Sequence, residues 1–432
     1  MLNLLAIPFL LPLILPSALA VDCECYRTST GHYFTNYEFY DFRKQSGPLP
    51  PVPELPDSLP RSPRPTAEDY SSNPKIGAYQ DGYIRSDEFT SSWSIQDWGK
   101  EPTSEFPIRM QNSRSNVYFV SADSSNSSSK MVVRTHRFDT FQSSAEIESA
   151  VQNVLYASIR VRARVYGAAG AVAGFFTYFN GQNETDIEVL TRDDPTEIRY
   201  SNQPVTDDRG NEIRGSSTKV NMTSQDRTDG TEAEKLKKRA TPTTLIRYDD
   251  WHTHRVDWVD GKSSWFVDGE HLLDKKYGVP IVPSYFIMNL WSDGGVWSGN
   301  MTKGQSAYME IEFVEMAFNT TGGDRSSSNR NVKGASAAKC DSICVIDGVA
   351  VTGTPEGAQS GAFKSAVNPW SLGVAILMIA VVLCVRMHIA DSGGSGKMSL
   401  GKQPKLGPEA IGKRQENDVA GGVDRRVANE GI

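Results

Sequence analysis

The stretch Ser158-Ile159-Arg160-Val161-Arg162-Ala163-Arg164-Val165 decides the fold class. Apolar and charged residues alternate along it with a period of two, which predicts a β-strand with one buried and one solvated face. Further candidate strands lie outward from it, at 171–179, 255–258, 265–267, 285–291 and 308–318. Asp260-Gly261, between two of them, is a typical hairpin turn. No segment of any length has a helical period, so the pattern predicts an all-β antiparallel sandwich over residues 76–320.

Composition limits the class of partner. The chain has 432 residues and a formal net charge of −7, which gives no basic surface for nucleic acid. Eight Trp residues suit a sugar-stacking surface as well as a hydrophobic core. The spacing of Cys and His offers no full set of metal ligands, so we expect neither a metal nor another cofactor.

Two apolar segments lie near the ends of the chain. Residues 1–20 end in Ala18-Leu19-Ala20, which predicts a cleaved signal peptide. Residues 366–385 contain no charged residue, and as a helix they would be long enough to cross a bilayer. Lys and Arg after this segment place the tail, 386–432, in the cytoplasm. A lipid-anchor signal is the alternative, but such signals end in their apolar tail. We therefore expect a single-pass membrane protein of the secretory pathway, with its main domain extracellular or lumenal and at the cell surface.

Composition also sets the other boundaries. Residues 21–75 contain the first two Cys residues and then eight prolines from Pro48 to Pro65, which predicts an N-terminal segment followed by an extended linker or surface wrap. The polar stretch 192–246 is expected to be a long loop that interrupts the sandwich. Residues 321–365 are rich in Gly and Ser and predict a stalk that contains the second Cys pair.

The four Cys residues outside the apolar segments are expected to form disulfides in an oxidising compartment. Cys23 and Cys25 are too close in sequence to bridge each other comfortably. Each is therefore expected to join Cys340 or Cys344, and both cross-pairings stay open.

Five Asn-x-Ser/Thr triplets are possible glycosylation sites. We expect Asn183 to be unmodified, because its position in a strand points it toward the space between the sheets. The other four are expected to carry glycans: Asn126, Asn221, Asn300 and Asn319.

The stretch 183–190 carries the chemistry. In a strand, alternate side chains share a face, so Glu184, Asp186 and Glu188 point one way while the residues between them point toward a core. Three adjacent carboxylates repel one another, and this arrangement is costly unless function requires it. A solvent-facing acidic strand is the alternative, but it fits poorly with the aromatic residues at 174–179.

Glu-Thr-Asp-Ile-Glu at 184–188 resembles the ExDxE signature of glycoside hydrolase family 16, fungal members especially. The similarity extends to 144–148, 251–258, 265–269 and 289–297, and it covers roughly residues 76–320. The resemblance implies a concanavalin A-like β-jelly roll of two antiparallel sheets, with a concave face that holds a glucan chain.

The resemblance also implies roles for individual residues. Glu184 would be the nucleophile and Glu188 the general acid/base of a retaining reaction, with Asp186 tuning their protonation. Retention of the anomeric configuration requires the two carboxyl groups to lie about 5–5.5 Å apart. Substrate binding is expected at Asn289, Trp291 and Trp297, with a core position as the alternative for each Trp. Trp258 and Trp265 are expected in the core.

We therefore predict a retaining β-glucan hydrolase of the 1,3 or 1,3/1,4 type in cell-wall polysaccharide metabolism. One alternative is a cell-wall glucan transglycosylase that uses the same residues, with a sugar hydroxyl in place of water. The other is a non-catalytic carbohydrate-binding module on the same fold. The intact set of three carboxylates disfavours the binding module, which has no need of them.

Overall fold

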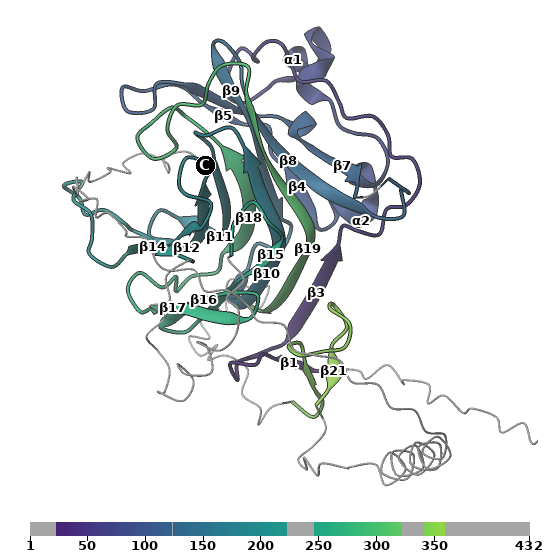
Figure 1. The fold of residues 1–432 in the computed structure, drawn as a ribbon, viewed down its shortest axis with the longest axis vertical. Coiled ribbons are helices and arrows are strands. Elements are labelled where there is room, and N and C mark those ends of the chain that lie inside the picture. Colours follow the sequence, from purple (N-terminus) through teal and green to yellow (C-terminus); the bar gives the residue numbers. More distant parts are fainter. Residues whose placement is uncertain (1–22, 123, 223–245, 322–339, 359–432) are drawn as a thin grey trace, which may run out of the picture. The chain divides into compact units, whose positions relative to one another are not determined.

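The computed structural model describes residues 23–122, 124–222, 246–321 and 340–358, which belong to one compact unit. Its regular structure is almost entirely β, which confirms the all-β class. Figure 1 shows two layers of strands, with β11, β12, β14 and β18 in one layer and β10, β15 and β19 in the other.

The first layer, named here the carboxylate sheet, is antiparallel throughout. In spatial order its strands are β4 (Trp93–Ile95), β9 (Phe141–Ser149), β18 (Tyr285–Trp291), β11 (Val172–Asn180), β12 (Asn183–Leu190), β13 (Glu197–Asn202) and β14 (Ser217–Asn221).

The second layer is named the opposing sheet. In spatial order its main strands are β7 (Val117–Ser121), β8 (Ser129–Arg137), β19 (Ser306–Thr320), β10 (Val154–Gly167), β15 (His252–Val259), β16 (Lys262–Val267) and β17 (Glu270–Lys275). Shorter strands at its margin are β3 (Asn36–Asp41), β5 (Gly99–Lys100) and β6 (Arg109–Asn112). β9 passes from one sheet to the other, and its pairing with β6 is parallel, so the sandwich is not purely antiparallel.

The core lies between the two sheets. Trp258 and Trp265 are fully buried in it, as the sequence predicted. The ring of Phe175, from the carboxylate sheet, stacks on that of His254, from the opposing sheet, with 5.7 Å between ring centroids. Large-to-small replacement of a buried Trp costs about 3–5 kcal/mol, so these residues hold the two layers together.

β10 confirms the alternation that was read from the sequence, with one exception. Ile159 and Val161 are buried in the core, while Arg162 and Arg164 remain partly exposed on the outer face. Arg160 was expected on the same wet face but is only 5% exposed. The cause is tertiary, because Asp347 from the far end of the described chain covers it and pairs with it at 2.8 Å.

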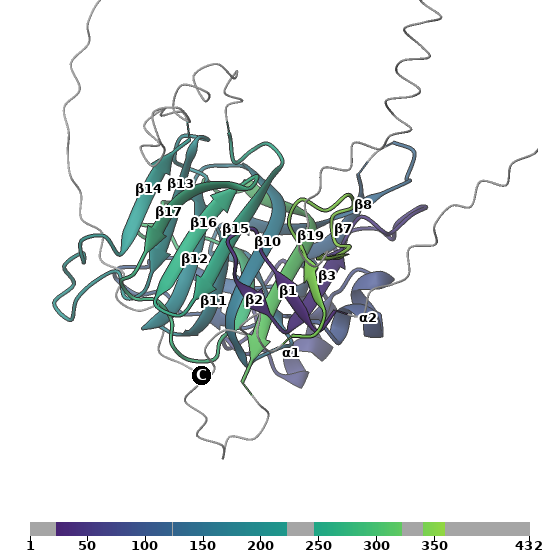
Figure 2. The same ribbon diagram turned by 90° about the horizontal axis from the view of Figure 1, so that it is seen from below.

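The covering segment is a small sheet that we call the clasp, residues 23–34 and 340–358. It contains β2 (Tyr33–Phe34), β1 (Cys25–Arg27), β20 (Ile343–Val345) and β21 (Glu356–Gly357). Cys23 bonds to Cys344 and Cys25 bonds to Cys340, which confirms cross-pairing of the N-terminal and C-terminal Cys residues. In Figure 2 the clasp strand β2 lies beside β19, and β1 lies beside β3.

Two segments expected to lie outside the sandwich are therefore built into it. The N-terminal segment supplies β1 and β2 of the clasp, and β3, which pairs with β19. The described end of the expected stalk supplies β20, and Ile346 from it joins the core.

The proline-rich stretch is a surface wrap and not a free linker. Its carbonyl groups accept hydrogen bonds from the body, from Gly99 N to Pro63 at 2.6 Å and from Arg109 to Pro60 at 3.2 Å. At the end of this stretch Thr66 caps the N-terminus of a short helix: its side chain accepts from Asp69 N, and the Asp69 side chain accepts from Thr66 N. The described helices are all short: α1 (Ala67–Ser72), η1 (Pro74–Gly77), η2 (Tyr83–Arg85), α2 (Asp87–Thr90) and η3 (Arg114–Asn116).

The stretch 192–246 differs from the expected long loop. Its first part forms β13 and β14, which extend the carboxylate sheet directly beside β12. The sequence pattern did not reveal these two strands, because the solvated face of each carries polar residues. Residues 223–245 lie outside the described part.

The structure bears on some of the expected surface features. Asn221 and Asn300 are exposed and Asn126 is partly exposed. Asn319 is only 3% exposed and its side-chain oxygen accepts from Thr35, so the folded domain leaves no room for a glycan there, and that expectation is corrected. Asn183 lies at the start of β12, where it is partly exposed and its side-chain oxygen accepts from Ile281 N at 3.3 Å.

No helix within the described ranges is long and apolar enough to cross a membrane. The expected signal peptide at 1–20, the expected span at 366–385 and the tail at 386–432 lie outside those ranges.

Candidate active site

β12 brings its three acidic residues to one face of the carboxylate sheet. Thr185, Ile187 and Val189 are at most 2% exposed and face the core. Glu184, Asp186 and Glu188 alternate with them and point to the outer face, which we call the carboxylate face. Asp186 and Glu188 are 2% and 8% exposed, while Glu184 is more accessible. The structure therefore places the three predicted residues together, with the most accessible carboxylate at the start of the strand.

Cross-strand register fixes what surrounds these carboxylates. On β11, Tyr178 pairs with Glu184, Phe176 with Asp186 and Gly174 with Glu188. Tyr178 also meets Tyr285 of β18, with their ring centroids 5.9 Å apart. Aromatic side chains thus line the carboxylate face beside the acidic row, where they present apolar ring surface.

Gly174 makes the close approach of the neighbouring strand possible. It lies between Glu188 on β12 and Asn289 on β18. A Cβ atom at this position would come within 2.7 Å of the Asn289 side-chain oxygen. Any larger residue at 174 would therefore displace Asn289.

Glu188 is held by Trp297. The Trp297 Nε1–H donates to Glu188 Oε1 at 3.2 Å. The Arg199 guanidinium lies 4.7 Å from the centroid of the Trp297 ring, and Arg199 in turn pairs with Asp193 at 2.7 Å. One face of the indole is thereby occupied, so Trp297 orients Glu188 and offers at most one face to a sugar.

The other predicted binding residues occupy the same face of β18. Asn289 is 9% exposed and its Nδ2 donates to Glu146 Oε2 at 3.3 Å. Trp291 follows two residues later, is partly exposed and pairs with Val172. Register places Trp291 on the carboxylate face, one row further along than Asn289.

Sequence reasoning assigned no role to a second acidic pair. Glu146 and Glu148 of β9 pair with Asn289 and Ile287 of β18 and therefore also lie on the carboxylate face. Burial raises the pKa of Glu146, and burial together with Glu146 raises the pKa of Glu148 to about 7. The period-two spacing of two Glu residues was the available signal, but without the register nothing connected it to β12.

The raised pKa of Glu148 predicts a pH-dependent stability. The folded protein holds this proton more tightly than the unfolded chain, whose pKa is near 4.5. The stabilising contribution is present below pH 4.5 and is lost as the pH rises through about 7. Glu148→Gln abolishes the titration, so wild type should lose on the order of 1–3 kcal/mol relative to this variant between about pH 4.5 and 8.

Urea unfolding of both proteins at about pH 4.5 and pH 8 measures this difference. Glu212→Gln, at an exposed position, is the matched control and should show no pH-dependent difference from wild type. Equal differences at both pH values for Glu148→Gln would contradict the assignment.

Residues 110–315 match the family model of glycosyl hydrolases family 16. These residues form a family 16 domain. The match starts in β6 and ends in β19, so the family 16 domain includes β12 and all of the carboxylate sheet except β4.

Individual relatives share less of the chain. A beta-glucanase of Paenibacillus polymyxa is 26% identical over 157 residues, which are 35% of this chain and 54% of the relative. The chain thus spans about half the length of the curated relative that it matches.

Solved structures similar to this chain include a beta-glucanase of Bacillus licheniformis, with 21% identity and a TM-score of 0.38 over 54% of this chain and 94% of that one. An endo-beta-1,3-glucanase of Pyrococcus furiosus has 16% identity and a TM-score of 0.38, over 54% of this chain and 90% of that one.

Proposed function

We propose that this protein is a retaining β-glucan hydrolase of the 1,3 or 1,3/1,4 type, acting in cell-wall polysaccharide metabolism. The observation that carries the proposal is the row of Glu184, Asp186 and Glu188 on one face of β12, within a family 16 domain. The beta-glucanase of Paenibacillus polymyxa, which is 26% identical to 157 residues of this chain, supports the choice of substrate class.

In the proposed mechanism Glu184 attacks the anomeric carbon of the glucan and forms a glycosyl-enzyme. Its greater exposure suits a group that must reach the sugar. Glu188 donates a proton to the leaving oxygen and afterwards takes one from the attacking water. The bond from Trp297 to Glu188 Oε1 holds this carboxyl group in place for both proton transfers.

Asp186 lies between the two glutamates and is nearly fully buried. Its side chain is 3.5 Å from Gln203 Nε2. A negative charge at Asp186 would disfavour simultaneous ionisation of both neighbours, which keeps one carboxyl group protonated as the reaction requires.

Product analysis on a panel of β-1,3-, β-1,4- and mixed-linkage glucans tests the proposal. We expect shortened products from a 1,3 or mixed-linkage glucan, with β configuration retained when the reaction is followed by proton NMR. Adding an oligosaccharide acceptor separates hydrolysis from transglycosylation, because a transglycosylase would form elongated products. Binding without cleavage of any glucan would overturn the enzyme assignment.

We also propose that the protein enters the secretory pathway and is anchored at the cell surface by residues 366–385. The two disulfides of the clasp support an oxidising compartment. Protease treatment of intact cells checks the orientation, since an epitope after Leu400 should survive unless the cells are permeabilised.

A further inference from the structure

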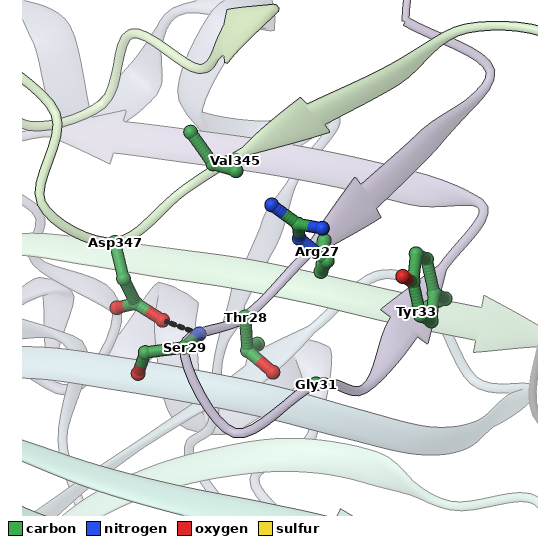
Figure 3. Close-up of a pocket in the computed structure, with 7 residues that line it drawn as sticks. All are labelled: Arg27, Thr28, Ser29, Gly31, Tyr33, Val345 and Asp347. Carbon is green, nitrogen blue, oxygen red and sulfur yellow. Dashed lines mark hydrogen bonds between the residues drawn. The ribbon is translucent and has the colours of Figure 1, made fainter. Parts of the chain in front are cut away.

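The clasp contains a pocket of about 380 Å³ on its outward face (Figure 3). Arg27 on β1 pairs with Tyr33 on β2 and with Val345 on β20, so these three side chains share one face of the small sheet. Tyr26, which lies on the opposite face, stacks on Tyr37 of β3 with 5.0 Å between ring centroids. The pocket therefore opens away from the sandwich.

This pocket is separate from the candidate active site. Asp347, in its wall, pairs with Arg160 of β10 at 2.8 Å and with Arg255 of β15 at 3.2 Å. Both arginines lie on the outer face of the opposing sheet, because their neighbours Ile159 and Val256 point into the core. Both layers of the sandwich thus lie between the pocket and the carboxylate face.

The pocket offers donors, an acceptor and apolar surface together. Within the described part of the chain, the Arg27 guanidinium has no hydrogen-bond or ion-pair partner. Its planar fork of N–H donors is therefore available to a ligand. Hydroxyl groups of Thr28 and Ser29 lie beside it, and Tyr33 and Val345 supply the apolar wall.

Asp347 sets the charge of the pocket. Its carboxylate accepts from Ser29 N at 2.6 Å as well as from the two arginines, which holds it in place (Figure 3). The lining thus carries one cation, Arg27, and one fixed carboxylate. An anionic ligand would be opposed by Asp347, and a wholly apolar ligand would leave Arg27 desolvated without a partner.

We propose that the clasp pocket is an accessory binding site for a neutral glycan, a short stretch of β-glucan. A pyranose has hydroxyl groups that both donate and accept, and an apolar face that packs on an aromatic ring, so it matches every element of the lining. The choice of β-glucan rests on the proposed function. Two sites on opposite sides of one domain would hold a long polymer more tightly than the active site alone, because the second contact forms at high effective concentration.

The test measures retention of the full chain on insoluble β-1,3-glucan. Every protein carries Glu184→Gln, so that the polymer is not cut during the assay. Arg27→Ala and Tyr33→Ala should each raise the dissociation constant at least about fivefold, the effect of losing one favourable contact. Arg85→Ala, which removes an exposed arginine on η2, is the matched control and should bind like the parent.

A second readout separates the accessory site from catalysis. In the chain with Glu184 intact, Arg27→Ala should cleave a short soluble oligosaccharide at a rate within about twofold of wild type, because that substrate does not reach the clasp. Arg27→Gln keeps part of the side chain and its packing. This variant replaces Arg27→Ala in both assays if the alanine variant unfolds at a lower temperature than wild type. Binding of both Arg27 variants equal to that of Arg85→Ala would overturn the site.

Two further outcomes identify the ligand and separate the proposals. Soluble oligosaccharides can be added as competitors for binding to the insoluble glucan. Displacement of the protein by an oligogalacturonate but not by a β-glucan oligosaccharide would overturn the assignment of a neutral glycan. Glucan binding that depends on Arg27 in a chain that cleaves no glucan would sustain the accessory site while the proposed function fails. Glucan cleavage together with binding that is insensitive to Arg27 would overturn the accessory site while the proposed function stands.

Discussion

Replacement of Glu184 or Glu188 by glutamine should lower glucan turnover by several orders of magnitude while the glucan still binds within a few-fold. Glutamine nearly keeps the shape of the side chain but removes the proposed nucleophile in one variant and the proposed proton donor in the other. In the proposed mechanism both carboxylates act in a single covalent reaction, so neither loss is compensated by the other. Initial rates on a β-1,3-glucan, together with equilibrium binding of the same polymer, measure the two effects.

Activated substrates distinguish the two roles. An aryl glycoside whose leaving group needs little protonation should recover part of the first step in Glu188→Gln but not in Glu184→Gln. Azide should then restore turnover of Glu188→Gln with retained β configuration, because the anion attacks the glycosyl-enzyme without a general base. Glu212→Gln is the control and should be fully active. Turnover at the wild-type rate in either active-site variant would refute the assignment.

Loss of both clasp disulfides should reduce the free energy of unfolding by about 2–5 kcal/mol. The two bonds join residues 321 and 315 positions apart and close nearly the same loop, so the unfolded chain is released from this restriction only when both are absent. The variant with all four clasp Cys residues replaced by alanine tests this by urea unfolding without reductant. Ser71→Ala, at an exposed position, should leave stability unchanged.

Peptide mapping without reduction checks the pairing itself. It should join a peptide containing Cys23 to one containing Cys344, and a peptide containing Cys25 to one containing Cys340. A local bridge between Cys340 and Cys344 would be inconsistent with the clasp.

Local patterns in the sequence were sufficient for the parts of this protein that depend on nearest neighbours along the chain. Alternation at 158–165 identified the strand β10, and Asp260-Gly261 identified the hairpin between β15 and β16. The same period of two placed Glu184, Asp186 and Glu188 on one face, because side-chain direction in a strand follows from backbone geometry alone.

Only the tertiary structure decided what lies beside each strand. Register joins Glu146 and Asn289 to the carboxylate face, and the fold places Trp297 against Glu188. Pairing between strands also shows that the polar stretch after β12 forms two further strands of the same sheet. Strand pairing links residues that are far apart in the chain, so no local period reports it.

The clasp illustrates the same limit at the largest sequence separation. The four Cys residues left both cross-pairings open at the level of the sequence. The alternation at 158–165 predicted that Arg160 would be solvated. Burial of Arg160 depends on Asp347, 187 positions away, and on the disulfides that bring the clasp onto β10. The sequence by itself determined the strands and the acidic row, while long-range packing decided which charged side chains are buried and paired, because desolvation and ion pairing depend on neighbours in space.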